Sequence, residues 1–245
     1  MPSDLLSYPE IIYQDTIAIQ IFSIVEVIMK LKDKVAIITG AAQGIGLGIS
    51  QRYSKEGAIV VMLDIDNNLL EQAAACIPRA SFYCIDISNK DSVQKTVNDI
   101  YSNHGRIDIC VNNAGIIRSG NVLEISEEDF DAVIGTNLKG ALFMSQATGK
   151  VMVSTKSGGS IINMSSVNGI MAIPNILPYN VSKGGLDQLT RVMAIALAEK
   201  KIRVNSIGPG SILTGMLQKV MIDDDKRKTI LSRTPMGRCG EVDEI

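Results

Sequence analysis

The architecture of this chain follows from Thr39-Gly40-Ala-Ala-Gln-Gly44-Ile45-Gly46, a segment that comes directly after an apolar run and opens a helical pattern. Glycine lets a chain turn sharply and approach a bound group closely, and the N–H groups at a helix N-terminus attract phosphate. The order of strand, glycine turn and helix therefore predicts a dinucleotide site. The residues expected in it are Gly40, Gln43, Gly44, Ile45 and Gly46. A tight turn that needs glycine only for backbone freedom is the alternative explanation, whereas the spacing excludes a kinase-like phosphate loop.

Short apolar runs alternate with helical patterns from Lys34 onward, which is typical of a parallel sheet with helices on both faces. Their composition indicates strands that are buried on both faces. The predicted strands are Val35–Thr39, Ile59–Asp64, Ser81–Asp86, Ile107–Asn112, Ser160–Met164 and Arg203–Ile207. Ser88 and Ser126 each precede an aspartate by three residues and predict helix starts, and apolar periodicity predicts a helix from Pro178 to Lys200. The fold class is therefore α/β, a doubly wound parallel sheet in three layers.

Asp64 ends the second predicted strand, eighteen residues after Gly46. A carboxylate near this spacing binds the adenosine ribose of NAD and repels the additional phosphate of NADP. Gln43 in the glycine loop also offers that phosphate no cation. The sequence thus favours NAD over NADP, although an aspartate at a strand end is also a common turn residue.

Tyr179 and Lys183 stand four residues apart in the long predicted helix and share one of its faces. A phenol with a pKa of about 10 is a poor base at neutral pH, and a neighbouring ammonium lowers that pKa by favouring the phenolate. Such a pair can exchange a proton with an alcohol. Considered alone, the same spacing is common by chance on amphipathic helices.

Taken together, the motifs make the chain from Lys32 to Ile245 resemble the short-chain dehydrogenase/reductase family. The motifs that carry the resemblance are the glycine segment, Asp86-Ile87, Asn112-Asn113-Ala114-Gly115, Asn137, Ser165-Ser166, Tyr179-Asn-Val-Ser-Lys183 and Gly208-Pro209-Gly210. The resemblance implies a Rossmann-type catalytic domain that interconverts a secondary alcohol and a ketone by hydride transfer with NAD(P). Substrates of the class include sugars, polyols, hydroxysteroids and 3-oxoacyl thioesters.

The resemblance also implies a role for each catalytic residue. Tyr179 is the expected general acid and base, and Lys183 lowers the pKa of Tyr179 and holds the nicotinamide ribose. Ser166, rather than its neighbour Ser165, stabilises the substrate oxygen. Asn137 holds a water that relays protons between Lys183 and solvent.

Further cofactor contacts come from the same resemblance. Asp86 and Ile87 are expected at the adenine, and Pro209 and Gly210 beside the nicotinamide carboxamide. The remaining expected cofactor residues are Asn113, Ala114, Gly115, Ile212 and Thr214. Residues from Met216 to Lys228 fall where the family carries a mobile lid.

The two ends of the chain depart from the family pattern. We expect a truncated product that lacks the last strand, with lower stability than a full-length relative, because the sixth strand then becomes an edge. The family forms homodimers or homotetramers partly through that region, and the resemblance implies such an assembly for this chain if the region is supplied. Residues 1–29 are an added segment, apolar from Ile17 to Met29 but too short and too acidic in its flanks for a membrane span. The catalytic domain is therefore assigned to residues 30–245.

Composition limits the other possibilities. A formal net charge of −2 gives no basic surface for nucleic acid. The single His104 and the absence of a CxxC motif leave no metal site, and we expect a cytoplasmic protein with reduced core thiols. These thiols are Cys76, Cys84, Cys110 and Cys239. The alternative function is an NAD-binding sensor or scaffold without turnover, and a sugar-nucleotide epimerase is disfavoured by the loop spacing.

Overall fold

The computed structural model describes residues 29–245, so the segment predicted at 1–29 lies, except for Met29, outside the described residues. Six parallel strands form one sheet in the order β3-β2-β1-β4-β5-β6. The strands are β1 (Val35–Thr39), β2 (Ile59–Asp64), β3 (Ser81–Cys84), β4 (Ile109–Asn112), β5 (Gly159–Met164) and β6 (Ile202–Ile207). The helices are α2 (Gly44–Lys55), α3 (Asn67–Ala75), α4 (Lys90–His104), α5 (Glu127–Ile134), α6 (Ala141–Ser154), α7 (Leu177–Leu197), α8 (Gly215–Met221) and α9 (Asp224–Ser232).

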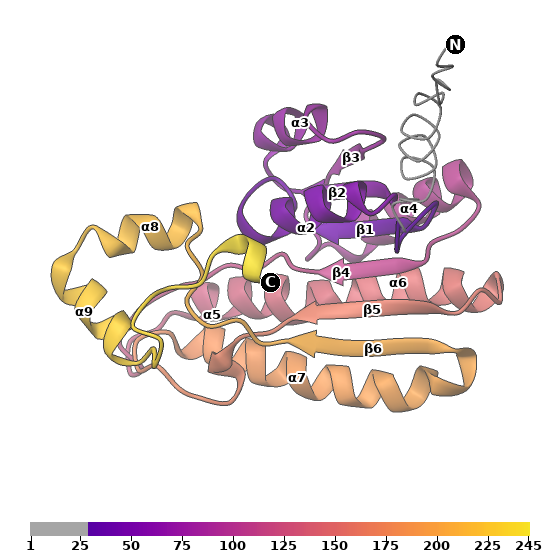
Figure 1. Cartoon of the computed structure of the whole chain (residues 1–245). Helices are drawn as coiled ribbons and strands as arrows, with labels where there is room; N and C mark the ends of the chain where they lie inside the picture. The colour runs from indigo at the N-terminus through magenta and orange to yellow at the C-terminus, as the bar shows by residue number, and fades with distance from the viewer. Residues whose placement is uncertain (1–28) are drawn as a thin grey trace, which may run out of the picture.

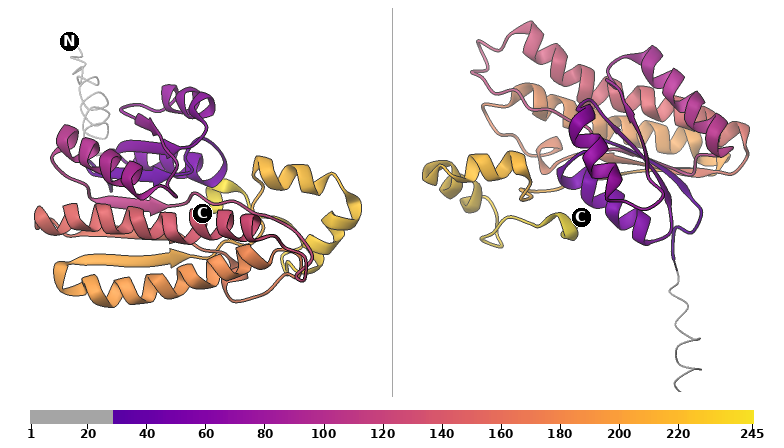
Figure 2. Two further views of the ribbon diagram at one scale, coloured as in Figure 1. Left: turned by 180° about the vertical axis from the view of Figure 1, so that it is seen from behind. Right: turned by 90° about the horizontal axis from the view of Figure 1, so that it is seen from above.

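Helices cover both faces of this sheet, which confirms the predicted Rossmann-type α/β class (Figure 1). Helices α4, α6 and α7 lie on one face, and α2 and α3 lie on the other (Figure 2). Alternate β1 residues point into the two cores, as Ile37 and Ile38 do, and both are fully buried. Burial of a side chain of this size contributes about 1.5–3 kcal/mol. The central strands therefore anchor the site that is built on their ends.

The two edge strands differ from the prediction of burial on both faces. Residues of β3 alternate between partly buried and exposed, and β6 is exposed from Asn205 to Ile207. The helices do not cover both faces of the sheet out to its edges, so one face of each edge strand is left exposed. β3 also ends at Cys84 instead of Asp86, and β4 begins at Ile109 instead of Ile107.

Helix starts were predicted with one success and one error. The Ser126 hydroxyl accepts a hydrogen bond from the Asp129 N–H and caps α5, as expected. The prediction for Ser88 was wrong, because Asn89 caps α4 by accepting from the Ser92 N–H at 2.9 Å. Asparagine caps as well as serine does, and sequence alone does not separate two neighbouring candidates.

The cysteines are free thiols, but they do not all belong to the core. Cys110 and Cys239 are buried, and burial raises the pKa of the Cys110 thiol to about 12. Cys76 and Cys84 are exposed, because one ends a helix and the other lies on an edge strand. Within residues 29–245 no group of three or more metal-binding side chains occurs, and no helix is both long and apolar enough to cross a membrane.

The last described segment extends beyond the carboxyl ends of the strands and then returns to the body. Helices α8 and α9 project from the sheet, where the family lid was expected (Figure 1). The chain then pairs Gly240 with Ile212 and brings Val242 against Gly48 of α2. This return places the segment after β6 next to the glycine turn.

Candidate active site

The predicted site residues gather at the carboxyl ends of β1, β2, β4, β5 and β6. The strand order reverses between β1 and β4, and ligands of open α/β sheets bind at such a switch point. The glycine turn follows β1 at this point, and Ser166 and Gly208 follow β5 and β6. Sequence segments that are far apart therefore meet at one edge of the sheet.

The glycine turn needs its glycines for space as well as for conformation. Gly40 and Gly44 have positive φ angles of 62° and 57°. A Cβ on Gly40 would lie 2.8 Å from the Ala114 Cα, and a Cβ on Gly46 would collide with the Gly40 carbonyl oxygen. Gln43 stands at the start of α2 without a capping side-chain bond, and the first turn of α2 carries no acidic residue. The turn thus offers an unopposed helix N-terminus to an anion.

Thr39 joins the glycine turn to the Asn113 segment, a connection that the sequence analysis missed. The Thr39 hydroxyl accepts the N–H groups of Asn113 and Ala114, each at 3.0 Å. The Asn113 amide donates in return to the carbonyl oxygens of Thr39 and Gly40, again at 3.0 Å. A buried threonine at a strand end that precedes a glycine turn is the signal that could have identified this role.

Asp64 lies at the end of β2, partly exposed, beside the glycine turn. Its Oδ2 accepts the Ala42 N–H at 3.0 Å, and its Oδ1 accepts the N–H groups of Ile65 and Asp66. A carboxylate has about four lone-pair positions, so three bonds leave about one for a ribose hydroxyl. Asp64 is therefore both the turn residue and a possible ribose ligand, and the two explanations are compatible.

Asp86 and Ile87 follow β3 on the nucleotide side of the sheet. Asp86 is exposed and its Oδ1 accepts the Ser88 N–H at 2.8 Å, which makes a local turn. The Ile87 side chain is buried against Gly140, so only its backbone is free to face a ligand.

Ser166 follows β5, and Tyr179 stands in the first turn of α7 beside it. Ser166 is buried, and its hydroxyl accepts the Asn168 N–H at 3.1 Å. Burial raises the pKa of Tyr179, and the hydrogen bond with Ser166 partly offsets that rise. Ser165 is directed elsewhere, because its hydroxyl donates to the Lys183 carbonyl oxygen.

Lys183 lies one turn along α7 with only 4% of its surface exposed. Its ammonium donates to the Met164 carbonyl oxygen at 2.6 Å and lies 5.5 Å from the centre of the Tyr179 ring. Burial lowers the pKa of Lys183 to about 8, although Asp187 raises it. The expected fall in the pKa of Tyr179 is not found in this structure, because burial of the phenol outweighs the bond that lowers its pKa.

Asn137 lies in a π-helical turn, Gly135–Gly140, between α5 and α6. Its amide donates to the Ile116 carbonyl and to the Ser182 hydroxyl, and its Oδ1 accepts the Ile116 N–H at 2.8 Å. A side chain on Gly115 would touch both Asn137 Oδ1 and the Lys183 ammonium. π-helical turns concentrate at functional sites, and this turn explains how an asparagine fits inside a helical segment.

The loop after β6 closes the site. The Pro209 carbonyl accepts the Val167 N–H at 3.0 Å, which holds the loop against the residue that follows Ser166. In the bridge to Gly240, Ser211 and Leu213 make the hydrogen bonds, so the N–H of Ile212 points to the opposite side. Thr214 lies against Gly44, where a Cβ would be 3.2 Å from its methyl group. The loop therefore runs from the turn after Ser166 to the glycine turn, and it carries the predicted residues Pro209, Gly210, Ile212 and Thr214.

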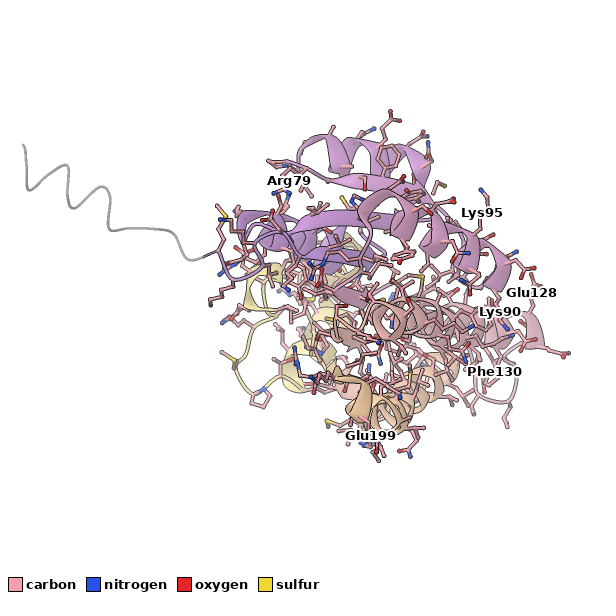
Figure 3. All side chains as sticks on the ribbon, turned by 90° about the vertical axis from the view of Figure 1, so that its right-hand side faces the viewer. Arg79, Lys90, Lys95, Glu128, Phe130 and Glu199 are labelled. Atoms are coloured by element: carbon pink, nitrogen blue, oxygen red, sulfur yellow. The ribbon has the colours of Figure 1, made fainter. Side chains whose placement is uncertain are left out.

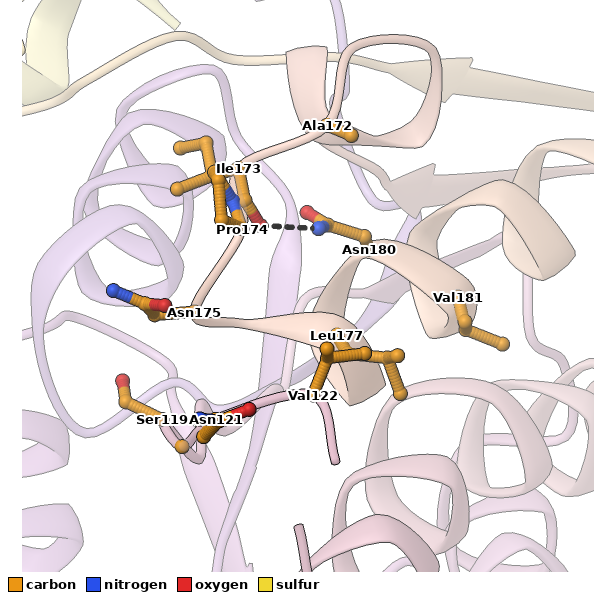
Figure 4. A pocket seen from close by; sticks show the side chains of 11 residues that line it. Ser119, Asn121, Val122, Ala172, Ile173, Pro174, Asn175, Leu177, Asn180 and Val181 are labelled. Carbon is orange, nitrogen blue, oxygen red and sulfur yellow. Dashed lines mark hydrogen bonds between the residues drawn. The ribbon is translucent and has the colours of Figure 1, made fainter. Parts of the chain in front are cut away.

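A cavity of about 840 Å³ opens beside this site, around the start of α7 (Figure 4). Its wall is mostly apolar, with Val122, Ile173 and Leu177, and Asn180 donates to the Ile173 carbonyl at 2.8 Å. Ser166, Tyr179 and Lys183 do not line it. The cavity is thus separate from these three predicted site residues.

A buried polar network beneath the site was also missed. The Asn112 amide donates to Ser145 and Asn163, and the Asn163 amide donates to Thr190, all at 2.8 Å. These side chains join β4, β5 and α6 to α7, the helix that carries Tyr179 and Lys183. Polar residues inside otherwise apolar strand runs were the available signal.

Comparison with known proteins decides the family. A family model described as enoyl-(acyl carrier protein) reductase matches residues 40–245. The chain is 38% identical to the 3-oxoacyl-[acyl-carrier-protein] reductase of Thermotoga maritima, over 89% of each chain. The chain belongs to the short-chain dehydrogenase/reductase family. It is an NAD(P)-dependent oxidoreductase that acts on alcohols and ketones.

Two further dehydrogenases match this chain over most of both lengths. Galactitol 2-dehydrogenase of Agrobacterium fabrum is 36% identical, over 89% of each chain. A crystal structure of NAD⁺-bound xylitol dehydrogenase superposes with a TM-score of 0.83 at 30% identity, covering 88% of this chain and 90% of the other.

Proposed function

We propose that the chain interconverts a secondary alcohol and a ketone with NAD, and that Ser166, Tyr179 and Lys183 perform the proton transfer. The observation that supports this most strongly is the Tyr179 ring 5.5 Å from the buried Lys183 ammonium, at the same edge of the sheet as buried Ser166 and the glycine turn. Residues 30–245 are the catalytic unit and residues 1–29 are an addition to it. A sensor without turnover has no chemical need for this set of residues.

The residues around the glycine turn fit a dinucleotide. The space at Gly40 and Gly46 admits no side chain, and the N-terminus of α2 meets no acidic side chain in its first turn. Lys183 would hold the nicotinamide ribose and the Ile212 N–H would meet the carboxamide, and the bound cofactor would supply the hydride chemistry. The adenine contacts are assigned to Asp86 and Ile87.

The proton steps belong to this chain's own side chains. In reduction, the Tyr179 hydroxyl donates its proton to the carbonyl oxygen, and the Ser166 hydroxyl hydrogen-bonds that oxygen as negative charge develops on it. In oxidation, Tyr179 accepts the proton of the alcohol. Lys183 supplies positive charge beside the phenol, and Asn137 holds the water through which Lys183 regains a proton.

NAD rather than NADP is the proposed cofactor. Asp64 places negative charge where the additional phosphate of NADP would lie, and its neighbour Ile65 is apolar and exposed. No cation of the glycine turn offsets that charge. We further propose a cytoplasmic homodimer or homotetramer, a state supported by exposed apolar side chains of α7 such as Val192 and Ile195.

The test is the reduction of NAD or NADP by the purified chain, followed by absorbance, with a panel of secondary alcohols. The panel contains polyols and 3-hydroxyacyl thioesters, because the named relatives are galactitol, xylitol and 3-oxoacyl-[acyl-carrier-protein] oxidoreductases. We expect turnover with at least one class and a higher kcat/KM with NAD. Equal or better use of NADP contradicts the cofactor proposal, and absence of turnover across the panel contradicts the proposed reaction.

A further inference from the structure

Asp187 lies one helical turn beyond Lys183 on α7 and is partly buried. Its carboxylate packs directly on Gly169, because a Cβ on that glycine would collide with Asp187 Oδ2. Gly169 in turn donates its N–H to the Ser166 carbonyl oxygen at 2.9 Å. The carboxylate therefore supports the turn that presents Ser166.

The same contact reaches the backbone of Lys183. The Cβ position of Gly169 lies 3.1 Å from Ser165 Oγ and 3.2 Å from the Lys183 carbonyl oxygen. The Ser165 hydroxyl also donates to that carbonyl at 3.4 Å. Gly169 is thus surrounded by the Asp187 carboxylate, the Ser165 hydroxyl and the Lys183 carbonyl. This close packing leaves Asp187 little freedom to move.

The Lys183 ammonium belongs to the residue one helical turn before Asp187, and the groups that it meets at close range are uncharged. From β5 it meets the Met164 carbonyl, from its own helix the Tyr179 ring, and across Gly115 the Asn137 amide. None of these groups is negatively charged at neutral pH. Burial lowers the pKa of Lys183 to about 8, and Asp187 is the charged residue that raises it among those described.

We propose that Asp187 is a positioning residue of the reaction, whose carboxylate braces the turn behind Ser166 and keeps the buried Lys183 ammonium protonated. Asp187 touches neither substrate nor cofactor and acts through Ser166 and Lys183. The inference rests on the proposed function, since it requires that turnover depends on a charged Lys183.

The first test is a titration of Lys183 in the cofactor-free protein, by NMR of chains labelled with [ε-¹³C]lysine. The Lys183 resonance is identified by its loss in Lys183→Arg. Asp187→Asn keeps the shape of the side chain and removes its charge, so we expect Lys183 to titrate at a pH lower by about half a unit or more. Asp187→Glu keeps the charge and should shift the titration less.

The second test is the pH profile of ketone reduction. A charged Lys183 is needed, so turnover falls as pH rises through the pKa of Lys183, and Asp187→Asn should move that fall to lower pH. At a pH below the fall of both the parent chain and Asp187→Asn, we expect the variant to have a kcat lower by about threefold to tenfold. The KM for NADH should change little, because the remaining loss comes from the turn that presents Ser166.

Glu199→Gln is the matched control, since Glu199 is an exposed carboxylate at the outer surface, in the turn directly after α7 (Figure 3). It should change neither titration nor profile. Gly169→Ala, which pushes the carboxylate away without removing it, should lower the Lys183 titration as Asp187→Asn does and serves if that variant does not fold.

An unchanged Lys183 titration in Asp187→Asn or, if that variant does not fold, in Gly169→Ala overturns the inference. So does a shifted titration with an unmoved pH profile. Full turnover in Tyr179→Phe would instead remove the proposed function, so the two failures are distinguishable.

Discussion

The glycine turn, the nucleotide end of the site, needs residues without side chains, whereas the catalytic end, at Ser166, Tyr179 and Lys183, depends on polar side chains that are buried. At Gly40 and Gly46 the place of a Cβ is already filled by main-chain atoms, and hydrogen bonds from the Asn113 side-chain amide to main-chain carbonyls hold the turn. At Ser166 and Lys183 the backbone is an ordinary turn and helix, and the chemistry comes from the burial of polar groups. The first end therefore depends on conformation and space, and the second depends on the electrostatics of its surroundings.

The largest expected effect is at the nucleotide end. Gly46→Ala places a methyl group on the Gly40 carbonyl, and because backbone must move to admit it, NADH binding should weaken by about 100-fold or more. Titration by NADH fluorescence measures this. Gly149→Ala is the control, since a Cβ there meets no atom within 4 Å. If the two variants bind NADH equally well, the nucleotide end is not defined by missing side chains.

Next in size is the loss of one hydroxyl at the catalytic end. Ser166→Ala should lower kcat by about 100-fold, because a donor to the reacting oxygen is removed from a buried site. NADH affinity should stay the same. Ser165→Ala changes the neighbouring hydroxyl, which is bonded to the Lys183 carbonyl, and should cost less than tenfold. Comparable losses of kcat in both variants would show that the assignment of the catalytic hydroxyl to Ser166 is wrong.

A smaller effect is expected at Asp64, which is both a turn residue and a possible ligand of the ribose. Asp64→Ala should reduce the ratio of kcat/KM for NAD to that for NADP by about tenfold, since removal of the charge relieves repulsion of the additional phosphate. Asp66→Asn removes a charge nearby and keeps an acceptor at the cap of α3, so the ratio should not change. An unchanged ratio in Asp64→Ala would make Asp64 a turn residue alone.

The smallest effect on activity is expected at Asp108, which lies at the opposite ends of the strands. Burial raises the pKa of Asp108, but the bonds from Arg106 and from the Val35 N–H lower it below its usual value. This stabilisation is present above the pKa of the unfolded chain, near 4 by an approximate reference value, and is lost as pH falls through the folded pKa.

Asp108→Asn should therefore reduce the free energy of unfolding at pH 7 by about 1–3 kcal/mol and flatten its fall between about pH 5 and pH 3, with normal kcat. Urea unfolding at several pH values measures both quantities. Asp33→Asn, which breaks an exposed ion pair with Arg79, provides the comparison and should have little effect. Equal pH dependence in Asp108→Asn and the parent chain would contradict this account.

The comparison also explains what the sequence could and could not predict. The bounds of β1 and β2 and the glycine turn after β1 were predicted correctly, because long apolar runs and glycine spacing are local signals. The cap of α4 and the limits of β3 were missed because neighbouring residues compete on nearly equal terms. The rise in the pKa of Tyr179 depends on burial by distant segments, which no local pattern records. The same is true of Asp187, whose role needs Gly169 and Lys183 to be seen side by side.

The most direct test of a separable nucleotide end and catalytic end is to measure NADH affinity and turnover together in Tyr179→Phe. The variant loses one hydroxyl from a half-buried ring and leaves the glycine turn untouched. We expect the NADH dissociation constant to stay within about twofold while kcat falls by about 10²- to 10⁴-fold. Turnover equal to that of the parent chain would contradict the assignment of Tyr179 as the proton donor, and a matching loss of NADH affinity would contradict the separation of the two ends.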